Sequence, residues 1–458
     1  MKKLERRAFL CLALVAVLLA GLVFFIVRIE TNGADWATFY ANTHIYANGK
    51  LSVGSVYDRN GKLLLKNTSK GMRYNSDELI RRANLHSSGD PAANIATGAN
   101  VAFKSRMVGY NFVTGTGGLL KMVGSKVYLT VDAKVNRSAY EALSGRNGLV
   151  GVYNYKTGEI VCMVSTPSYD PGENGRNTLS NPLPGTYMNK LISGTLTPGS
   201  TFKLVTTAAI EQIDGINKWT YKCTGSLAVG GDKITCPKVH GTMDIYGALA
   251  NSCNCAYATL AMELGGDVLA EYADSLQLTK SYDIDGIKSA AGTFNFDSAD
   301  VNIGWAGIGQ FEDQLNPLSM MVYMGAIAGE GKAALPVLLS DESLIKKGAE
   351  LIGSDSAAGA AAGSVRLLSS ETARTLSDMM RNNVKVTYGD GNYPGLSLHA
   401  KSGTAEVGTG KAPHSWFCGF AGDYAFIVCV ENGGYGSSVA GPVANNVLQY
   451  MKSEGCKF

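Results

Sequence analysis

The chain has 458 residues, of which 45% are hydrophobic and 17% charged, and its formal net charge at pH 7 is +3. This composition excludes a generally disordered protein, and the length allows two or three domains. Because the net charge is small and no long basic run with interleaved aromatic residues occurs, we expect no nucleic-acid partner.

An uncharged apolar segment, residues 9–27, lies near the start of the chain and is long enough to cross a bilayer as a helix. The residues just before it are rich in positive charge: Lys2, Lys3, Arg6 and Arg7. The positive-inside rule therefore predicts a cytoplasmic tail at 1–8 and the rest of the chain outside the cell membrane. A cleavable signal peptide is the alternative, but the segment is longer than a usual signal core and no small-x-small cleavage site follows it. We predict an uncleaved single-pass anchor that contacts the lipid bilayer through residues 9–27.

Residues 28–124 are predicted to form a small pedestal module beside the membrane. The clearest local signal in this module is the segment 54–65, two short β-runs around an Asn60-Gly61 turn. No catalytic constellation occurs there, so we expect support or partner binding rather than chemistry.

The remaining residues, 125–458, are predicted to form one α+β domain. Its expected elements, in chain order, are a strand at 127–131, a helix at 133–143, a hairpin at 149–155 and 159–165, a mainly helical region at 200–328, a surface loop at 353–364, strands within 415–430 and a terminal helix at 439–453. Strands at both ends around a helical middle predict that the two terminal parts share one sheet.

Ser200-Thr201-Phe202-Lys203 follows a Pro198-Gly199 pair and precedes an apolar run. A serine hydroxyl is a poor nucleophile unless a neighbouring group takes its proton. If Ser200 opens a helix, positions i and i+3 share a face and the Lys203 amine can reach the hydroxyl. Burial and the helix dipole would both lower the pKa of that lysine, and the helix start offers N–H groups to an oxyanion. A solvated helix start with a surface lysine explains the pattern equally well when it stands alone.

Two further clusters supply partners for this serine. Ser252-Cys253-Asn254 falls inside a helix-like stretch at 248–264, and Lys401-Ser402-Gly403-Thr404 follows a short alternating run. Period-two alternation places Ser402 and Thr404 on one face of a strand and Lys401 on the other. We expect the two hydroxyls to face a ligand carboxylate and the amine to face the other serines. Gly403 would let an extended peptide lie close to the strand.

Several of the nine cysteines invite a bonding hypothesis. In an exported domain Cys223 and Cys236 could form a disulfide. A zinc site from Cys223, Cys236, His240 and Cys253 is conceivable, but its spacing matches no compact ligand pattern, so we expect no metal.

The three clusters, in this order, resemble the set used by penicillin-binding proteins and serine β-lactamases. Over nearly the whole chain the sequence is similar to the class B, monofunctional transpeptidase, penicillin-binding proteins. The further segments that carry this resemblance are Asp58-Arg59-Asn60-Gly61, Leu129-Thr130-Val131-Asp132, Lys156-Thr157-Gly158-Glu159-Ile160, Pro167-Ser168-Tyr169-Asp170-Pro171, His240-Gly241, Gly309-Gln310, Asn316-Pro317-Leu318 and Thr404-Ala405-Glu406. Ser402 replaces the commoner threonine, and the short pedestal resembles that of compact members.

The resemblance implies an α+β fold of the penicillin-binding and serine β-lactamase type, an antiparallel sheet flanked by helices plus an all-helical part. It also implies a peptidoglycan D,D-transpeptidase that forms an acyl-enzyme on Ser200 and is acylated by β-lactams. The roles that it implies are Lys203 as base, Ser252 as proton relay, Asn254 as substrate and Lys203 ligand, Lys401 as positive charge, Ser402, Gly403 and Thr404 as substrate-binding residues, and the N–H groups of Ser200 and Thr404 as oxyanion hole.

Three rival functions stay open at this point: a β-lactamase, a D,D-carboxypeptidase, and a sensor that binds β-lactam or muropeptide without turnover. By resemblance, the chain works without a cofactor on peptidoglycan stem peptides. Its expected protein partner is a membrane glycan polymerase of the shape, elongation, division and sporulation family, contacted through the anchor and pedestal. Tyr388 and Trp416, near the third cluster, are expected to pack in the core or at the rim of the cleft.

Overall fold

The computed structural model describes residues 2–42, 45–47, 49–110, 124–210, 213, 216–296, 299–340 and 363–458. Residues 353–362 of the predicted surface loop lie outside these ranges.

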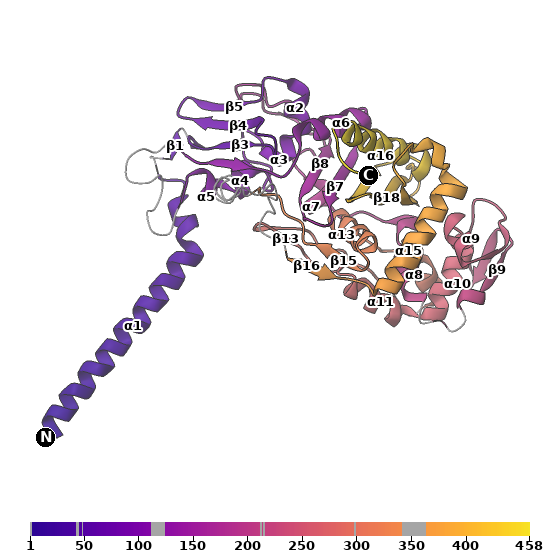
Figure 1. Ribbon diagram of the computed structural model, residues 1–458, viewed down its shortest axis with the longest axis horizontal. Helices are drawn as coiled ribbons and strands as arrows, with labels where there is room; N and C mark the ends of the chain where they lie inside the picture. The colour runs from indigo at the N-terminus through magenta and orange to yellow at the C-terminus, as the bar shows by residue number, and fades with distance from the viewer. Residues whose placement is uncertain are drawn as a thin grey trace.

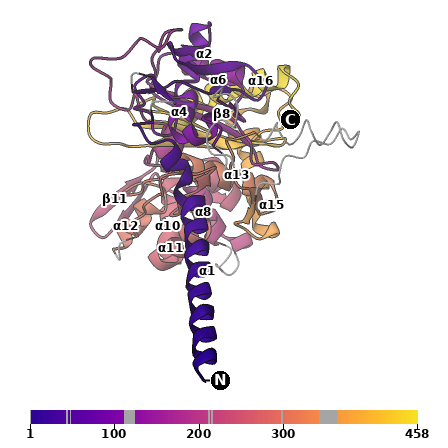
Figure 2. The same ribbon diagram turned by 90° about the vertical axis from the view of Figure 1, so that its left-hand side faces the viewer.

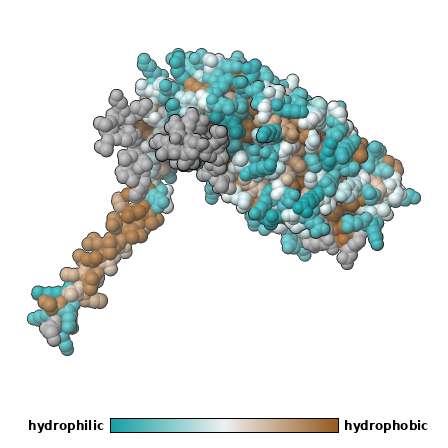
Figure 3. Space-filling view, in the orientation of Figure 1, coloured by the Kyte–Doolittle hydropathy of each residue, from teal (hydrophilic) through white to brown (hydrophobic). Residues whose placement is uncertain are grey.

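One long helix, α1 (Lys2–Ala37), projects from the body of the molecule in both ribbon views (Figure 1, Figure 2). Large apolar side chains are exposed along it, and the space-filling view shows an apolar surface along the middle of the helix, with hydrophilic residues at its free end (Figure 3). Among the described residues it is the only helix long and apolar enough to cross a membrane. Such a surface fits lipid rather than water, so α1 has the features of the single-pass anchor predicted at 9–27.

The N-terminal part of the body is built on a four-stranded sheet with the strand order β5-β4-β3-β6. Its elements are β1 (Tyr46–Ala47), β2 (Lys50–Leu51), β3 (Ser55–Tyr57), β4 (Leu63–Thr68), β5 (Gly71–Tyr74), α2 (Glu78–Ala83), α3 (Leu85–Ser88), α4 (Ala99–Ala102), α5 (Lys104–Met107) and β6 (Lys126–Tyr128). The predicted pair of strands around Asn60-Gly61 is confirmed, because β3 and β4 pair in antiparallel fashion.

The fourth strand of this sheet comes from beyond the predicted pedestal. Strand β6 runs parallel to β3, with Val56 opposite Val127. The segment predicted to open the next domain at residue 125 therefore completes the N-terminal sheet. The division of the chain at 28–124 and 125–458 stays a prediction.

The centre of the molecule is a five-stranded antiparallel sheet with the order β17-β18-β19-β7-β8. Its strands are β7 (Gly148–Asn154), β8 (Ile160–Thr166), β17 (His399–Ala405), β18 (His414–Ala421) and β19 (Tyr424–Val430). The first two come from early in the domain and the last three from its end, so the predicted sheet shared by both terminal parts is confirmed.

Helices cover both faces of this sheet (Figure 1). One face packs on α6 (Ala133–Leu143) and α16 (Gly436–Ser453), and the other on α13 (Pro317–Ala328). Alternate residues of one strand enter the two cores, as Ile427 and Val428 of β19 do. Strands buried on both faces appear in the sequence as nearly continuous apolar runs, which is why 415–430 was recognisable.

The region between the two halves of the sheet contains helices and several small sheets. Its elements are α7 (Lys190–Ser193), η1 (Gly199–Thr201), α8 (Lys203–Ala209), η3 (Ile216–Lys218), β9 (Thr220–Cys223), β10 (Ser226–Val229), β11 (Asp232–Thr235), β12 (Gly241–Asp244), α9 (Ile245–Ala250), α10 (Asn254–Leu264), α11 (Gly266–Ser275), β13 (Asp283–Ile284), β14 (Ile287–Lys288), α12 (Asp300–Ala306), α13, β15 (Lys332–Ala334), β16 (Ser364–Arg366), α15 (Ser370–Asn383), η4 (Val384–Tyr388) and η5 (Asp390–Asn392).

The strand pairs β9–β12 and β10–β11 depart from the mainly helical region predicted at 200–328. Each of these strands has four residues, too few for a period-two pattern to stand out. The Gly230-Gly231 turn that joins β10 to β11 was the available signal, because glycine pairs favour tight hairpin turns.

A buried asparagine joins the N-terminal part to the central sheet. Asn136, in α6, donates from Nδ2 to Asn84 Oδ1 at 2.8 Å, and its Oδ1 accepts from the backbone N–H of Met163 in β8 at 2.9 Å. Both asparagines are almost fully buried, so these hydrogen bonds have no water to replace them.

We expect Asn136→Ala to lower the free energy of unfolding by about 1–3 kcal/mol, because buried groups on Asn84 and Met163 would lose their partner. Urea unfolding of the full-length protein in detergent measures this loss. Asn446→Ala, exposed on α16, is the matched control and should change the free energy by about 0.5 kcal/mol or less. Equal effects of the two substitutions would contradict the role of Asn136.

Candidate active site

Ser200 lies at the point where a loop becomes a helix. It is the middle residue of the short helical turn η1, and Lys203 is the first residue of α8. Gly199, just before it, has a φ of 55°, and a Cβ there would lie 2.6 Å from the carbonyl oxygen of Thr404. Only glycine allows both this conformation and this close approach. The turn that carries Ser200 is thereby held against β17.

The second cluster lies at a break between two helices rather than inside one. The helix-like stretch predicted at 248–264 is α9 and α10, separated by Asn251, Ser252 and Cys253. Ser252 has a φ of 51°, a left-handed conformation that ends α9, and Cys253 caps α10. The break turns Ser252 and Asn254 towards Lys203, which a continuous helix could not do with neighbours two positions apart.

Lys203 is the centre of a hydrogen-bond network. Its Nζ lies 3.1 Å from Ser200 Oγ and 2.7 Å from Asn254 Oδ1. It also lies 2.7 Å from the carbonyl oxygen of Ser252 and 3.3 Å from Ser252 Oγ. The Lys203 side chain is fully buried, whereas Ser200 is only half-buried. The serine is therefore the more accessible of the two residues.

A second buried amine approaches from the sheet. Lys401 Nζ donates to Ser252 Oγ at 2.9 Å and to the carbonyl oxygen of Ser402 at 2.7 Å. Ser252 Oγ thus lies between the amines of Lys203 and Lys401. The structure brings together all five residues predicted as catalytic: Ser200, Lys203, Ser252, Asn254 and Lys401.

Burial controls the charge of both amines. It lowers the pKa of Lys203 to about 7, against a partial opposing effect of the nearby Cys253, Cys236 and Cys255 thiols. Burial, together with the charge of Lys203, holds the pKa of Lys401 well below its usual range. A buried amine that is neutral at physiological pH can accept a proton, which an ordinary lysine cannot.

Strand β17 divides its side chains between two environments, as its alternation predicted. Ser402 and Thr404 are half-buried, whereas Lys401, Gly403 and Ala405 are buried. The structure shows a different reason for a glycine at position 403 from the one that we expected. A Cβ there would lie 2.8 Å from Thr201 Cγ2 and 3.0 Å from the Pro198 carbonyl oxygen, so the residue is small because the Ser200 turn packs on it.

Tyr388 contributes to the site in a way that the sequence did not reveal. It is buried in the π-helical turn η4, where its hydroxyl donates to Ser402 Oγ at 3.0 Å and accepts from the Ser402 N–H at 2.8 Å. Trp416 is fully buried, as expected, and its Nε1 donates to the Thr197 carbonyl oxygen at 3.0 Å. Neither contact has a fixed sequence spacing, so only the fold could show them.

The cysteines beside the second cluster also differ from expectation. Cys223 and Cys236 are free, so the disulfide predicted between them is not formed in the structure. The sequence spacing did not reveal how close the four possible metal ligands lie, because β9–β12 and β10–β11 gather residues that are distant in the sequence. The ligand atoms of Cys223, Cys236, His240 and Cys253 all lie within 4.8 Å of one another.

An antiparallel sheet flanked by helices, with a serine hydroxyl beside a buried lysine amine, is typical of the class of penicillin-recognising serine enzymes. Residues 148–449 match the family model for the penicillin binding protein transpeptidase domain. The chain belongs to this family, and the resemblance to class B penicillin-binding proteins is confirmed.

Curated relatives and solved structures agree with this family. Peptidoglycan D,D-transpeptidase PbpA of Mycolicibacterium smegmatis is 29% identical over 370 residues, which cover 72% of this chain and 73% of the relative. The crystal structure of PBPA from Mycobacterium tuberculosis has a TM-score of 0.71 at 23% identity, covering 88% of this chain and 99% of that one. Its ceftriaxone acyl-enzyme complex has a TM-score of 0.69, also at 23% identity, and covers 87% and 97%.

Burial of a neutral amine also makes stability depend on pH. Folded Lys203 releases its proton at about pH 7, whereas an unfolded lysine does so at 10.5. Between these values the unfolded chain binds more protons, so the contribution of Lys203 to the free energy of unfolding rises with pH, by up to about 1.4 kcal/mol per pH unit.

We therefore expect the free energy of unfolding of wild type to rise relative to that of Lys203→Met as the pH increases above about 7. Urea unfolding in detergent at a series of pH values measures it. Lys457→Met, exposed near the C-terminus, should differ from wild type by an amount that does not change with pH. A pH-independent difference for Lys203→Met would contradict the burial of a neutral amine.

Proposed function

We propose that this protein is a peptidoglycan D,D-transpeptidase that cross-links stem peptides ending in D-Ala-D-Ala, and that β-lactams acylate the same serine. One observation carries the proposal: the fully buried amine of Lys203 lies 3.1 Å from the hydroxyl of the half-buried Ser200, and burial lowers the pKa of that amine. The names of the PbpA relatives and the acyl-enzyme complexes of the M. tuberculosis protein support it.

Acylation begins with the Ser200 hydroxyl. Its oxygen attacks the carbonyl carbon of the penultimate D-alanine, and neutral Lys203 accepts the hydroxyl proton. The carbonyl oxygen becomes an oxyanion, which the N–H groups of Ser200 and Thr404 stabilise. Contact between Gly199 and the Thr404 carbonyl keeps these two N–H groups on adjacent segments.

Collapse of the tetrahedral intermediate requires a proton on the leaving group. The C–N bond breaks, and the amine of the terminal D-alanine takes a proton that passes from Lys203 through Ser252 Oγ. The 3.3 Å and 2.9 Å distances of Ser252 Oγ to the two lysine amines support a relay at this position. Asn254 holds Lys203 and hydrogen-bonds the peptide of the substrate.

The third cluster binds the substrate carboxylate. The Ser402 and Thr404 hydroxyls lie on the partly exposed face of β17, and Lys401 supports this strand from its buried face by donating to the carbonyl oxygen of Ser402. Tyr388 orients the Ser402 hydroxyl because it donates to Ser402 Oγ and occupies the Ser402 N–H. Gly403 keeps the strand close to the Ser200 turn.

The acyl group then passes to the amine of a neighbouring stem peptide, which restores the Ser200 hydroxyl and forms the cross-link. Transfer to water would give a D,D-carboxypeptidase or, with a β-lactam, a β-lactamase. Within the described ranges, the hydrogen bonds of Ser200, Lys203, Ser252 and Lys401 involve no Asp or Glu side chain that could activate a water.

In this function α1 is a single-pass anchor, with its N-terminus in the cytoplasm and the catalytic part outside. The four basic residues before the apolar segment support this orientation. We assign the membrane glycan polymerase as the partner of α1 and the N-terminal sheet. A structurally similar protein, PBP2 of Helicobacter pylori, has been solved in complex with MreC (TM-score 0.63, 19% identity, covering 75% of this chain and 68% of that one), so assembly with another protein has a precedent in this fold.

Fluorescent penicillin should label wild-type protein in membranes, and Ser200→Ala should remove the label, because the variant has no nucleophile. Ser453→Ala, exposed at the end of α16, is the control and should label fully. Labelling of Ser200→Ala at the wild-type level, or an unlabelled wild type, would overturn the assignment.

Lys401→Ala should slow penicillin acylation about 100-fold or more, because Ser252 Oγ loses one of its two amine partners in the proton relay and the Ser402 carbonyl loses its buried donor. Stopped-flow or gel-based acylation rates measure this change, and Lys457→Ala is the control for loss of one lysine. An unchanged acylation rate in Lys401→Ala would exclude Lys401 from the mechanism. Products formed from stem-peptide substrates distinguish cross-linking from hydrolysis.

A further inference from the structure

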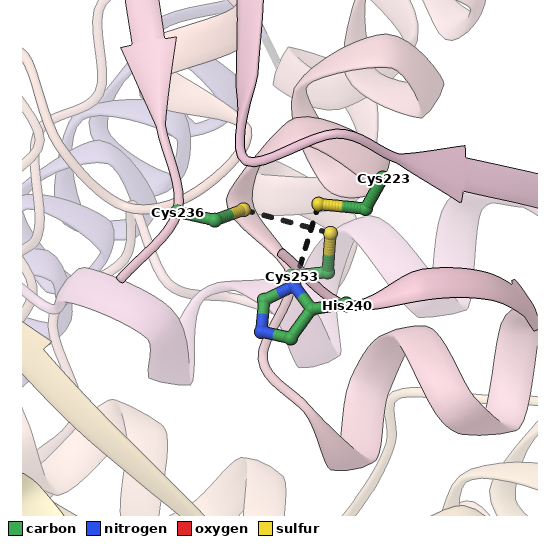
Figure 4. Close-up of side chains that lie close together, drawn as sticks. All are labelled: Cys223, Cys236, His240 and Cys253. Carbon is green, nitrogen blue, oxygen red and sulfur yellow. Dashed lines mark hydrogen bonds between the residues drawn. The ribbon is translucent and has the colours of Figure 1, made fainter. Parts of the chain in front are cut away.

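Four soft ligand atoms converge beside the second cluster (Figure 4). Cys223 Sγ lies 3.5 Å from His240 Nδ1, Cys236 Sγ lies 3.6 Å from Cys253 Sγ, and all four atoms lie within 4.8 Å of one another. A tetrahedral zinc site with metal–sulfur bonds of about 2.3 Å has ligand–ligand edges of about 3.8 Å. The spacing is that of ligands around one ion, and it is far longer than a disulfide bond of about 2.05 Å.

The fold builds this cluster from separate segments. Cys223 ends β9 and pairs in register with Gly241 of β12, which places His240 next to it. Cys236 directly follows β11, and Cys253 is the N-cap of α10. The small sheets and α10 lie at the end of the body opposite to α1 (Figure 1).

Backbone N–H groups point at all three sulfur atoms. Gly225 donates to Cys223 Sγ at 3.4 Å, Cys255 to Cys236 Sγ at 3.4 Å, and Ala256 to Cys253 Sγ at 3.5 Å. Donors of this kind stabilise thiolates and orient them as metal ligands. Three thiolates so close together repel one another unless a cation lies between them, and Cys223 and Cys253 are fully buried.

We propose that Cys223, Cys236, His240 and Cys253 bind one Zn²⁺ ion in a closed structural site. Thiolate and imidazole ligands in a tetrahedron select zinc over the oxygen-preferring cations Ca²⁺ and Mg²⁺. On binding, the three thiols release their protons, and the resulting Cys₃His complex carries one net negative charge. Four protein ligands leave no open position, so the ion organises the chain and activates no water.

A fifth residue, Cys255, lies near the site as a neighbour rather than a ligand. Its Sγ is 3.4 Å from Cys236 Sγ, but it is directed at the carbonyl oxygen of Ile234 at 3.7 Å. Cys255 contributes to the site only through its backbone N–H, which donates to Cys236 Sγ.

The metal would affect the active site by holding the backbone around Ser252 and Asn254 in place. Cys253 stands between Ser252 and Asn254, whose side chains contact Lys203. Asn254 Nδ2 also donates to the carbonyl oxygen of Thr235 at 2.8 Å, and Thr235 directly precedes Cys236. An ion bound to Cys236 and Cys253 would therefore fix the backbone next to Thr235 and the backbone next to Asn254, which are the two partners of this hydrogen bond. It would also fix the left-handed turn at Ser252. We regard Cys223, Cys236, His240 and Cys253 as positioning residues.

The direct test is the metal content of the full-length protein, purified in detergent without chelator and measured by inductively coupled plasma mass spectrometry. We expect one zinc per chain. A strong chelator should lower the melting temperature and open Cys223, Cys236 and Cys253 to alkylation, and added zinc should reverse both effects. Reconstitution with Co²⁺ should give the absorption bands of tetrahedral cobalt with thiolate ligands.

Two variants identify the ligands. His240→Ala and Cys223→Ser should each lose most of the zinc, while Cys456→Ser, outside the cluster, should keep one zinc per chain. The alkylation measurement on wild type stands even where a variant fails to fold.

Wild type without zinc, with a Cys223–Cys236 disulfide detected by mass spectrometry of unreduced peptides, would overturn the proposal. So would full zinc content in both His240→Ala and Cys223→Ser. Metal content is read without any penicillin reaction, so the two proposals fail separately. A protein that holds zinc but is never acylated would contradict the transpeptidase function alone.

Discussion

Two lysine amines, on Lys203 and Lys401, are buried on either side of one hydroxyl, that of Ser252. Burying two cations so close together is unfavourable, and the chain resolves this by letting the amines lose their protons. In the proposed function, the neutral Lys203 amine gives the half-buried Ser200 hydroxyl a base that needs no histidine. The proposed relay, oxyanion hole and carboxylate site all depend on this arrangement.

The fold meets this constraint by joining distant parts of the chain. Strands from both ends of the catalytic domain share the central sheet, which brings Lys401 on β17 against the turn of Ser200. Gly199 and Gly403 lack the side chains that would keep these two segments apart. Ser252 reaches the two amines only because α9 ends in a left-handed residue before α10 begins.

The elements that could be predicted from the sequence are those with a long apolar pattern. The helix at 133–143, the hairpin that became β7 and β8, and the strands of 415–430 were recognisable because apolar periodicity extends over many residues. The five residues around Ser252 were predicted from three short motifs in a known order. Three other features have no such pattern, because each depends on tertiary packing. They are the four-residue strands, the helix break at Ser252 and the contact of Tyr388 with Ser402. The Cys223, Cys236, His240 and Cys253 cluster was hidden for the same reason.

If neutral Lys203 is the base for Ser200, the pH dependence of the acylation rate must follow the lowered pKa of this amine. The second-order rate constant for acylation by penicillin, measured across pH, reports the pKa of the base in the free protein. We predict a rate that rises with pH, with a midpoint at about 7, and then levels off. A rate that still rises towards the ordinary lysine pKa of 10.5, or one that does not change with pH, would contradict a buried neutral amine as the base for Ser200.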